Sequence, residues 1–160
     1  MLKTFEMTSD ADRVIRALKI MSEKTGIHGM LGGQSVDVEN DGKEISREML
    51  DYIYEHKTSA LIEASMMAGA ILGGADEEQT ALIEKAASAI GMAFQIQDDI
   101  LDVTSSSQEL GKPVHSDEKN HKVTYVTLFG VEKASEQVLQ FSEQAQSILE
   151  NLSNKNKFLT

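Results

Sequence analysis

The stretch 95-QIQDDILD-102 sets three aspartates inside an apolar run, and its spacing decides the fold of the region around it. An α-helix turns by about 100° per residue, so positions i, i+3, i+4 and i+7 share one face. The polar residues with this spacing are Gln95, Asp98, Asp99 and Asp102. The opposite face carries Ile96, Ile100 and Leu101, which we expect to point into a core. The stretch therefore predicts an amphipathic helix with an acidic C-terminal end.

The acidic face continues toward the N-terminus through small residues, Gly91 and Ser88. Small side chains behind a row of carboxylates leave room for another molecule. We therefore expect a pocket with a charged mouth on this side of the helix.

The rest of the chain is also predicted to be helical. Its 160 residues suit one ordinary domain, and they include one proline and only 5% aromatic residues. Alanine, leucine, isoleucine, methionine, glutamate and lysine dominate, and most of them favour helices. We predict a single all-α domain over residues 1–160. The expected helices cover 9–26, 30–39, 46–72, 77–103, 124–130 and 131–153, with a loop at 104–122 and a frayed tail from 153.

Two details of these helices can be predicted. In the first, Val14, Ile15 and Leu18, with Ile20 or Met21, are expected on the buried side. In the third, the polar sequence HKTS interrupts the apolar rhythm. A kink is expected near residues 57–59, because serine and threonine can bond back to the preceding turn.

The net charge of −11 excludes some partners, because so acidic a surface repels nucleic acid and anionic lipid. The chain has no cysteine, which rules out disulfide and thiol chemistry. The longest apolar stretch, 64–75, is too short and too rich in glycine to span a bilayer. With no signal peptide visible at the N-terminus, we expect a cytoplasmic protein.

The acidic cluster needs compensation, since a helix C-terminus already carries partial negative charge. Mg²⁺ would supply it, because this hard cation prefers oxygen ligands and keeps water and phosphate oxygens in its shell. The candidate metal ligands are Asp98, Asp99 and Asp102, and the implied substrate is a phosphate ester. The alternative is a solvated acidic face with no ligand.

Three lysines in polar breaks surround the acidic helix: Lys57, Lys112 and Lys122. Each could be an ordinary surface charge. Together they fit a diphosphate held by metal ions on one side and by ammonium groups on the other.

Five motifs then follow one another in order: GMLGGQSVDVE at 29–39, HKTSALI at 56–62, AFQIQDDILDVT at 93–104, LGKPVHSD at 110–117 and HKVTY at 121–125. They resemble those of the trans-prenyl diphosphate synthases, the family of farnesyl and geranylgeranyl diphosphate synthases, especially its bacterial short-chain members. Terpene cyclases share the DDxxD pattern but lack the GGQ and HKT motifs. The resemblance implies the C-terminal part of the isoprenoid synthase helical bundle.

The resemblance also implies a reaction, the Mg²⁺-dependent condensation of isopentenyl diphosphate with an allylic diphosphate. Asp98 and Asp102 would take part in Mg²⁺ binding, with Asp99 in or beside that shell. Full-length family members are usually homodimers, so a homodimer or other homo-oligomer is expected. The same resemblance implies roles for the remaining residues. The allylic diphosphate would be bound by Lys57, Lys112 and Lys122, and the developing carbocation would lie near Thr58 and Gln95. Phe94 would line the isopentenyl diphosphate site, and Gln34 and Asp37 would support the site.

The first aspartate-rich motif of the family has no counterpart before residue 98. We therefore expect this chain to be the C-terminal half of a synthase, inactive on its own. The alternative is a non-catalytic helical regulatory subunit of a heteromeric synthase. Product chain length cannot be predicted, because in the family it is set mainly by residues just before the first motif.

Overall fold

The computed structural model describes residues 10–105 and 122–152, and its regular structure within these ranges is helical throughout. This confirms the predicted all-α class. The elements are α1 (Ala11–Thr25), α2 (Met30–Glu39), α3 (Arg47–Tyr54), the π-helical turn η2 (Glu55–Ser59), α4 (Ala60–Gly73), α5 (Glu77–Thr104), α8 (Tyr125–Phe129) and α9 (Val131–Glu150).

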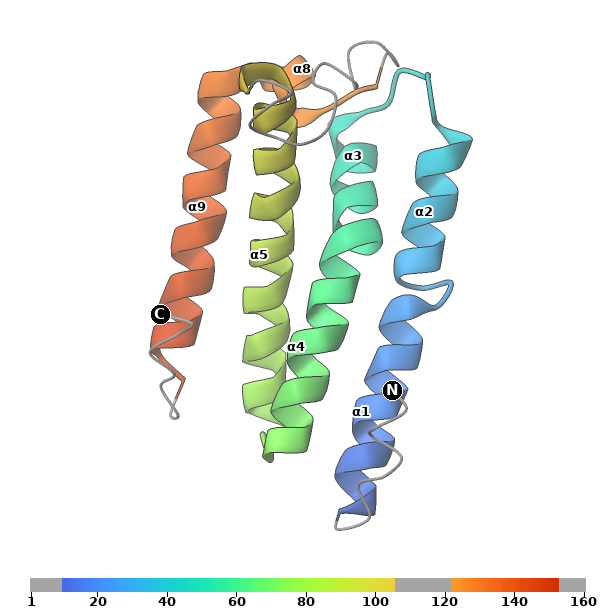
Figure 1. The fold of residues 1–160 in the computed structure, drawn as a ribbon, viewed down its shortest axis with the longest axis vertical. Helices are drawn as coiled ribbons and strands as arrows, with labels where there is room; N and C mark the ends of the chain where they lie inside the picture. The colour runs from blue at the N-terminus through green and yellow to red at the C-terminus, as the bar shows by residue number, and fades with distance from the viewer. Residues whose placement is uncertain (1–9, 106–121, 153–160) are drawn as a thin grey trace.

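The helices stand side by side as four columns (Figure 1). One column holds α1 and α2, the next holds α3, η2 and α4, and the last two are α5 and α9. Neighbouring columns run in opposite directions, with α1 packed on α4, α4 on α5, and α5 on α9. The short helix α8 crosses the end of the row at which α5 finishes. The acidic end of α5 therefore lies beside the start of α3 and the segment that leads into α8.

Side-chain caps mark the starts of α1, α3, α5 and α8. Asp10 accepts a hydrogen bond of 3.2 Å from the backbone N–H of Arg13, and Ser46 accepts one of 3.3 Å from Met49. At the start of α5, Asp76 accepts from the N–H of Gln79 at 2.8 Å, and the Gln79 side chain accepts from the N–H of Asp76. Such caps satisfy N–H groups that have no partner within the helix.

The main core lies beneath the acidic end of α5. Ile96 and Ile100 are buried there, as the periodicity predicted, while Leu101 is half-buried. The buried members of this cluster are Leu50, Ile53, Tyr54, Met92, Ile96, Ile100, Tyr125 and Ala134. The helix that carries the acids is thus anchored on its other face by α3, α8 and α9.

The predicted buried side of α1 was wrong at Ile15, which is 63% exposed. Ala17 is fully buried instead and packs against Ala68 and Ile71 of α4. The contact stripe of α1 runs through positions 14, 17 and 21, a spacing of i, i+3 and i+7, and Ile15 lies off it. A small residue at the centre of this stripe lets the two helices approach closely.

The interruption predicted near residues 57–59 is the π-helical turn η2. Ser59 is fully buried, and its Oγ donates a 3.2 Å hydrogen bond to the carbonyl of Tyr54, five residues earlier. The serine thus bonds back, as its sequence context indicated. Thr58 bonds to α5 instead.

Candidate functional site

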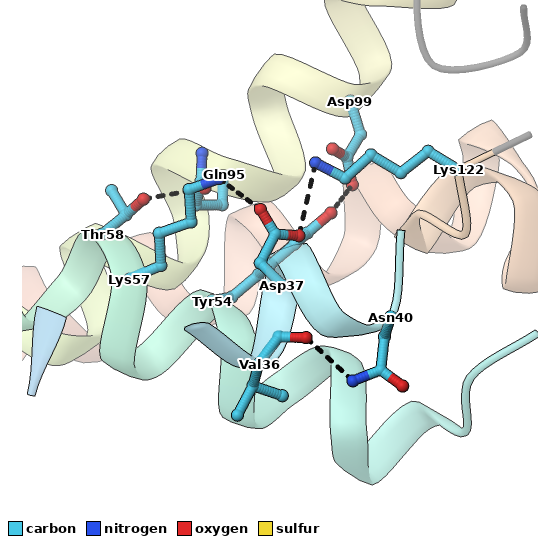
Figure 2. A network of polar contacts seen from close by, with 9 residues as sticks. All are labelled: Val36, Asp37, Asn40, Tyr54, Lys57, Thr58, Gln95, Asp99 and Lys122. Atoms are coloured by element: carbon cyan, nitrogen blue, oxygen red, sulfur yellow. Dashed lines mark hydrogen bonds and ion pairs between the residues drawn. The ribbon is translucent and has the colours of Figure 1, made fainter. Parts of the chain in front are cut away.

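The predicted site residues come from four parts of the fold: α2, η2, α5 and the segment before α8 (Figure 2). A π-helical turn adds one residue to a helical turn, and such turns are frequent at functional sites. Here the turn carries Lys57 and Thr58. The side chains of Lys57 and Thr58 therefore project into the space between α2 and α5.

Asp37 joins the two predicted lysines that the structure describes. Its Oδ2 lies 2.5 Å from Nζ of Lys57, and its Oδ1 lies 3.6 Å from Nζ of Lys122. The side chain of Asp37 is only 14% exposed, whereas the lysines are 32% and 35% exposed. One carboxylate on α2 thus holds two ammonium groups together at a surface that solvent reaches.

Thr58 and Gln95 also meet. The hydroxyl of Thr58 donates a 2.8 Å hydrogen bond to Oε1 of Gln95, which links η2 to α5 (Figure 2). Gln95 lies one helical turn before Asp98 and Asp99. The amide and the acidic end of α5 consequently stand on the same side as the lysine pair.

Asp99 accepts hydrogen bonds from two tyrosines. Its Oδ2 accepts a 2.6 Å hydrogen bond from the Tyr54 hydroxyl and a 3.1 Å bond from the backbone N–H of Tyr125. Asp99 is 8% exposed and Asp102 is 2% exposed, whereas Asp98 is half-buried. Of the three acids, Asp98 is therefore the most accessible to a ligand.

Sequence reasoning missed the two tyrosines around Asp99. Tyr54 precedes Lys57 by three residues, and Tyr125 ends the HKVTY motif, so both lie near predicted residues without showing a pattern of their own. The Tyr125 hydroxyl donates to Asp51, and burial together with this hydrogen bond raises the pKa of Tyr125. Tyr125 consequently ties α8 to both α3 and α5.

The expected pocket along the small-residue face was wrong at Gly91. A Cβ atom placed there would lie 2.5 Å from Cβ of Ser59, so the space is already filled by η2. Ser88, one turn earlier, lines a cavity of about 300 Å³ beside Lys24 and Glu84. The small residue nearest the acids thus serves helix packing and not an open pocket.

The other predicted residues are Phe94, Lys112 and Gln34. Phe94 is 60% exposed and lines a groove of about 440 Å³ between α5 and α9. Lys112 lies outside the described residues. Gln34 is half-buried on α2, one turn before Asp37.

The same side chains determine whether the site can bind a metal ion. In the described ranges 10–105 and 122–152, no three His, Cys, Asp or Glu side chains are gathered so as to hold an ion by themselves. Mg²⁺ is usually bound through one or two carboxylates together with waters and substrate phosphates, so a complete protein cage is not required. The half-buried carboxylate of Asp98 at the end of α5 fits that mode of binding.

Comparison with known proteins agrees with this arrangement of helices. The sequence matches the Polyprenyl synthetase family over residues 1–158, and the chain belongs to this family. It is 40% identical over 137 residues to a farnesyl diphosphate synthase of Geobacillus stearothermophilus, covering 86% of this chain and 46% of that protein. It is 43% identical over 140 residues to a chloroplastic geranylgeranyl pyrophosphate synthase of Catharanthus roseus, covering 87% of this chain and 39% of that protein.

The chain also resembles solved structures of a geranyltransferase and a polyprenyl synthetase. A geranyltransferase of Helicobacter pylori, complexed with magnesium and isoprenyl diphosphate, superposes with a TM-score of 0.82 at 30% identity. The match covers 98% of this chain and 51% of that one. A polyprenyl synthetase of Streptomyces coelicolor, at 19% identity and a TM-score of 0.80, shares the fold. The chain thus spans about half the length, or somewhat less, of the relatives it matches.

Proposed function

We propose that this chain carries the diphosphate-binding half of a trans-prenyl diphosphate synthase site, used in isoprenoid biosynthesis. The observation that carries the proposal is the carboxylate of Asp37 between Lys57 and Lys122, at 2.5 and 3.6 Å. Two ammonium groups held together beside an acidic helix end can bind a polyanionic leaving group and its metal ions.

Asp98 and Asp102 are the proposed Mg²⁺ ligands. The Helicobacter pylori geranyltransferase of the same fold was solved with magnesium, which supports magnesium as the ion. Asp99 holds Tyr54 and Tyr125 through one oxygen, so its proposed role is to support that shell. When bound, Mg²⁺ neutralises charge that develops on a departing diphosphate.

The proposed reaction joins an allylic diphosphate to isopentenyl diphosphate. The allylic C–O bond breaks and its electron pair leaves with the diphosphate, which Lys57, Lys112 and Lys122 would hold. The double bond of isopentenyl diphosphate then forms the new C–C bond, and a proton is lost to the departing diphosphate. Thr58 and Gln95 would direct their dipoles at the developing positive charge, and Phe94 would line the second substrate's site.

A complete site would require more than these residues. We propose that the chain corresponds to the C-terminal half of its relatives and that the first aspartate cluster of the family completes the metal site. The isolated 160-residue chain is then expected to be inactive with Mg²⁺, isopentenyl diphosphate and dimethylallyl or geranyl diphosphate. Turnover under these conditions would overturn that expectation.

Binding can be tested without turnover. Calorimetric titration of the chain with inorganic pyrophosphate should show binding in MgCl₂ and weaker binding in EDTA. Lys57→Met should weaken it roughly 10- to 100-fold, the value of one hydrogen bond to a charged group. Asp98→Asn should abolish most of the difference between MgCl₂ and EDTA.

Matched controls are available in the same chain. Lys19→Met removes a lysine that is 71% exposed on α1, and Glu78→Gln removes an acid in the first turn of α5. Both should bind pyrophosphate like the unchanged chain. Equal binding by Lys57→Met and Lys19→Met would contradict the proposed site.

A further inference from the structure

The π-helical turn η2 lies between α2 and α5, and a glycine of each helix packs directly against it. Gly33 of α2 faces it from one column, and Gly91 of α5 faces it from the next. Both glycines are buried. The turn bears Lys57 and Thr58, so its position decides where these two side chains stand.

Gly33 touches the backbone of the turn. A Cβ atom at this position would lie 2.7 Å from both C and Cβ of His56, and closer still to the backbone nitrogen of Lys57. Carbon atoms that are not bonded pack at about 3.5 to 4.0 Å. A methyl group on Gly33 must therefore push the Lys57 segment away from α2.

Gly91 makes the matching contact from α5. A Cβ atom there would lie 2.6 Å from Cα and 2.5 Å from Cβ of Ser59. Ser59 is the last residue of the turn and directly follows Thr58. Gln95, which accepts the Thr58 hydrogen bond at 2.8 Å, lies one helical turn beyond Gly91. Contact at Gly91 and contact at Gln95 therefore depend on the same separation of η2 and α5.

We propose that Gly33 and Gly91 are positioning residues that hold η2 between α2 and α5, and so place Lys57 next to Asp37 and Thr58 next to Gln95. Neither glycine touches a substrate. The consequence for diphosphate binding rests on the proposed function; the placement of the two side chains does not.

The first test observes the placement directly, in the ligand-free 160-residue chain. The side-chain amide signals of Gln95 in ¹⁵N–¹H spectra report the Thr58 hydrogen bond, and Thr58→Val defines the shift that follows its loss. Gly91→Ala should move these signals in the same direction as Thr58→Val. Adding Ser59→Gly should return them part of the way, because it removes the serine Cβ and Oγ that the new methyl group meets and leaves the contact with Cα at 2.6 Å.

Gly69→Ala is the matched control. Gly69 also lies within a helix, α4, but a Cβ atom there meets nothing within 4 Å. This variant should leave the Gln95 signals unchanged. Ser59→Gly alone measures how far loss of the serine side chain moves the Gln95 signals when Gly91 is unchanged.

The second test uses pyrophosphate with MgCl₂. Gly33→Ala and Gly91→Ala should each lower its affinity by about tenfold, the effect of misplacing one charged or polar contact, and Gly69→Ala should not. If the unchanged chain does not bind pyrophosphate, the proposed function fails, yet the ligand-free spectra still decide the role of Gly91.

Two results would overturn the inference. One is a folded Gly91→Ala protein whose Gln95 signals match those of Gly69→Ala. The other is a defect of Gly91→Ala, including failure to fold, that Ser59→Gly does not relieve even in part, since the Ser59 side chain would then not contribute to it.

Discussion

The Tyr54 hydroxyl donates a 2.6 Å hydrogen bond to Oδ2 of Asp99, which joins α3 to the acidic end of α5 across 45 residues of sequence. Both residues are buried, at 5% and 8% exposure. This contact lies in the core just beneath the proposed metal and diphosphate site. It therefore couples the stability of the bundle to the placement of the acids.

Tyr54→Phe is expected to destabilise the chain by about 1.5 to 3 kcal/mol, the range for a hydrogen bond to a charged group. The ring and its packing are kept, so the loss comes from the hydroxyl. Urea unfolding followed by circular dichroism measures the change. Tyr52→Phe, at a tyrosine that is 38% exposed, should alter the free energy of unfolding by less than about 0.5 kcal/mol. Equal effects of the two substitutions on the free energy of unfolding would contradict a stabilising contribution of the Tyr54–Asp99 hydrogen bond.

A second prediction concerns Asp37. Asp37→Asn removes the carboxylate between Lys57 and Lys122 and leaves two ammonium groups facing each other. The chain should lose roughly 1 to 3 kcal/mol of stability, and pyrophosphate should raise the melting temperature of the variant by more than it raises that of the unchanged chain. Thermal unfolding with and without pyrophosphate measures both effects.

Asp41→Asn provides the comparison, since Asp41 is exposed just beyond the end of α2. It should change neither stability nor the response to pyrophosphate. If pyrophosphate raises the melting temperature of Asp37→Asn no more than that of Asp41→Asn, the anion does not bind at the two lysines that Asp37 joins.

The local parts of the fold were predictable because their causes are local. Caps and apolar periodicity act over three or four residues, so the expected ranges 9–26 and 77–103 lie close to the observed Ala11–Thr25 and Glu77–Thr104, and 46–72 begins at the observed cap Ser46. The prediction for Ile15 was wrong because two residue sets could form the apolar stripe of α1. Which set is buried depends on α4, more than forty residues away.

The candidate site was predictable in residue type but not in pairing. Lys57 and Thr58 stand in one motif, yet their partners Asp37 and Gln95 lie 20 and 37 residues away in opposite directions. Periodicity could place the acids on one face, but only packing shows that Asp99 faces two tyrosines and that Gly91 is covered by Ser59. The roles of these residues in binding and catalysis stay predictions.

A third prediction concerns pH. Lys24 lies 2.5 Å from both Glu63 and Glu84, and its side chain is 23% exposed. Burial alone would lower the pKa of Lys24, but the hydrogen bonds to the two glutamates outweigh it and raise the pKa above the ordinary value of 10.5. Stability from a raised pKa is fully present below the ordinary value and is lost as pH rises through the folded-state pKa.

Lys24→Met should therefore cost roughly 3 kcal/mol near neutral pH, because it leaves the 9% exposed Glu63 without its cation. The difference between the unchanged chain and the variant should hold steady up to about pH 10 and shrink at higher pH. Lys19→Met, which breaks an exposed 3.8 Å pair with Glu23, should cost less than about 1 kcal/mol. Urea unfolding across the alkaline range tests this; a difference that grows with pH would contradict it.

The last prediction concerns self-association. Leu31 and Val38 are 52% and 64% exposed, and their spacing of seven residues puts them on one face of α2. Exposed apolar side chains gathered in this way are typical of interfaces. We therefore expect the chain to form a homo-oligomer through this face, and Leu31→Lys with Val38→Lys to shift it to the mass of a single chain in sedimentation equilibrium. Leu139→Lys, at a leucine 62% exposed on α9, should leave the oligomer intact. An unchanged chain that sediments as a monomer at every concentration would contradict the prediction, as would an oligomer that survives both α2 substitutions.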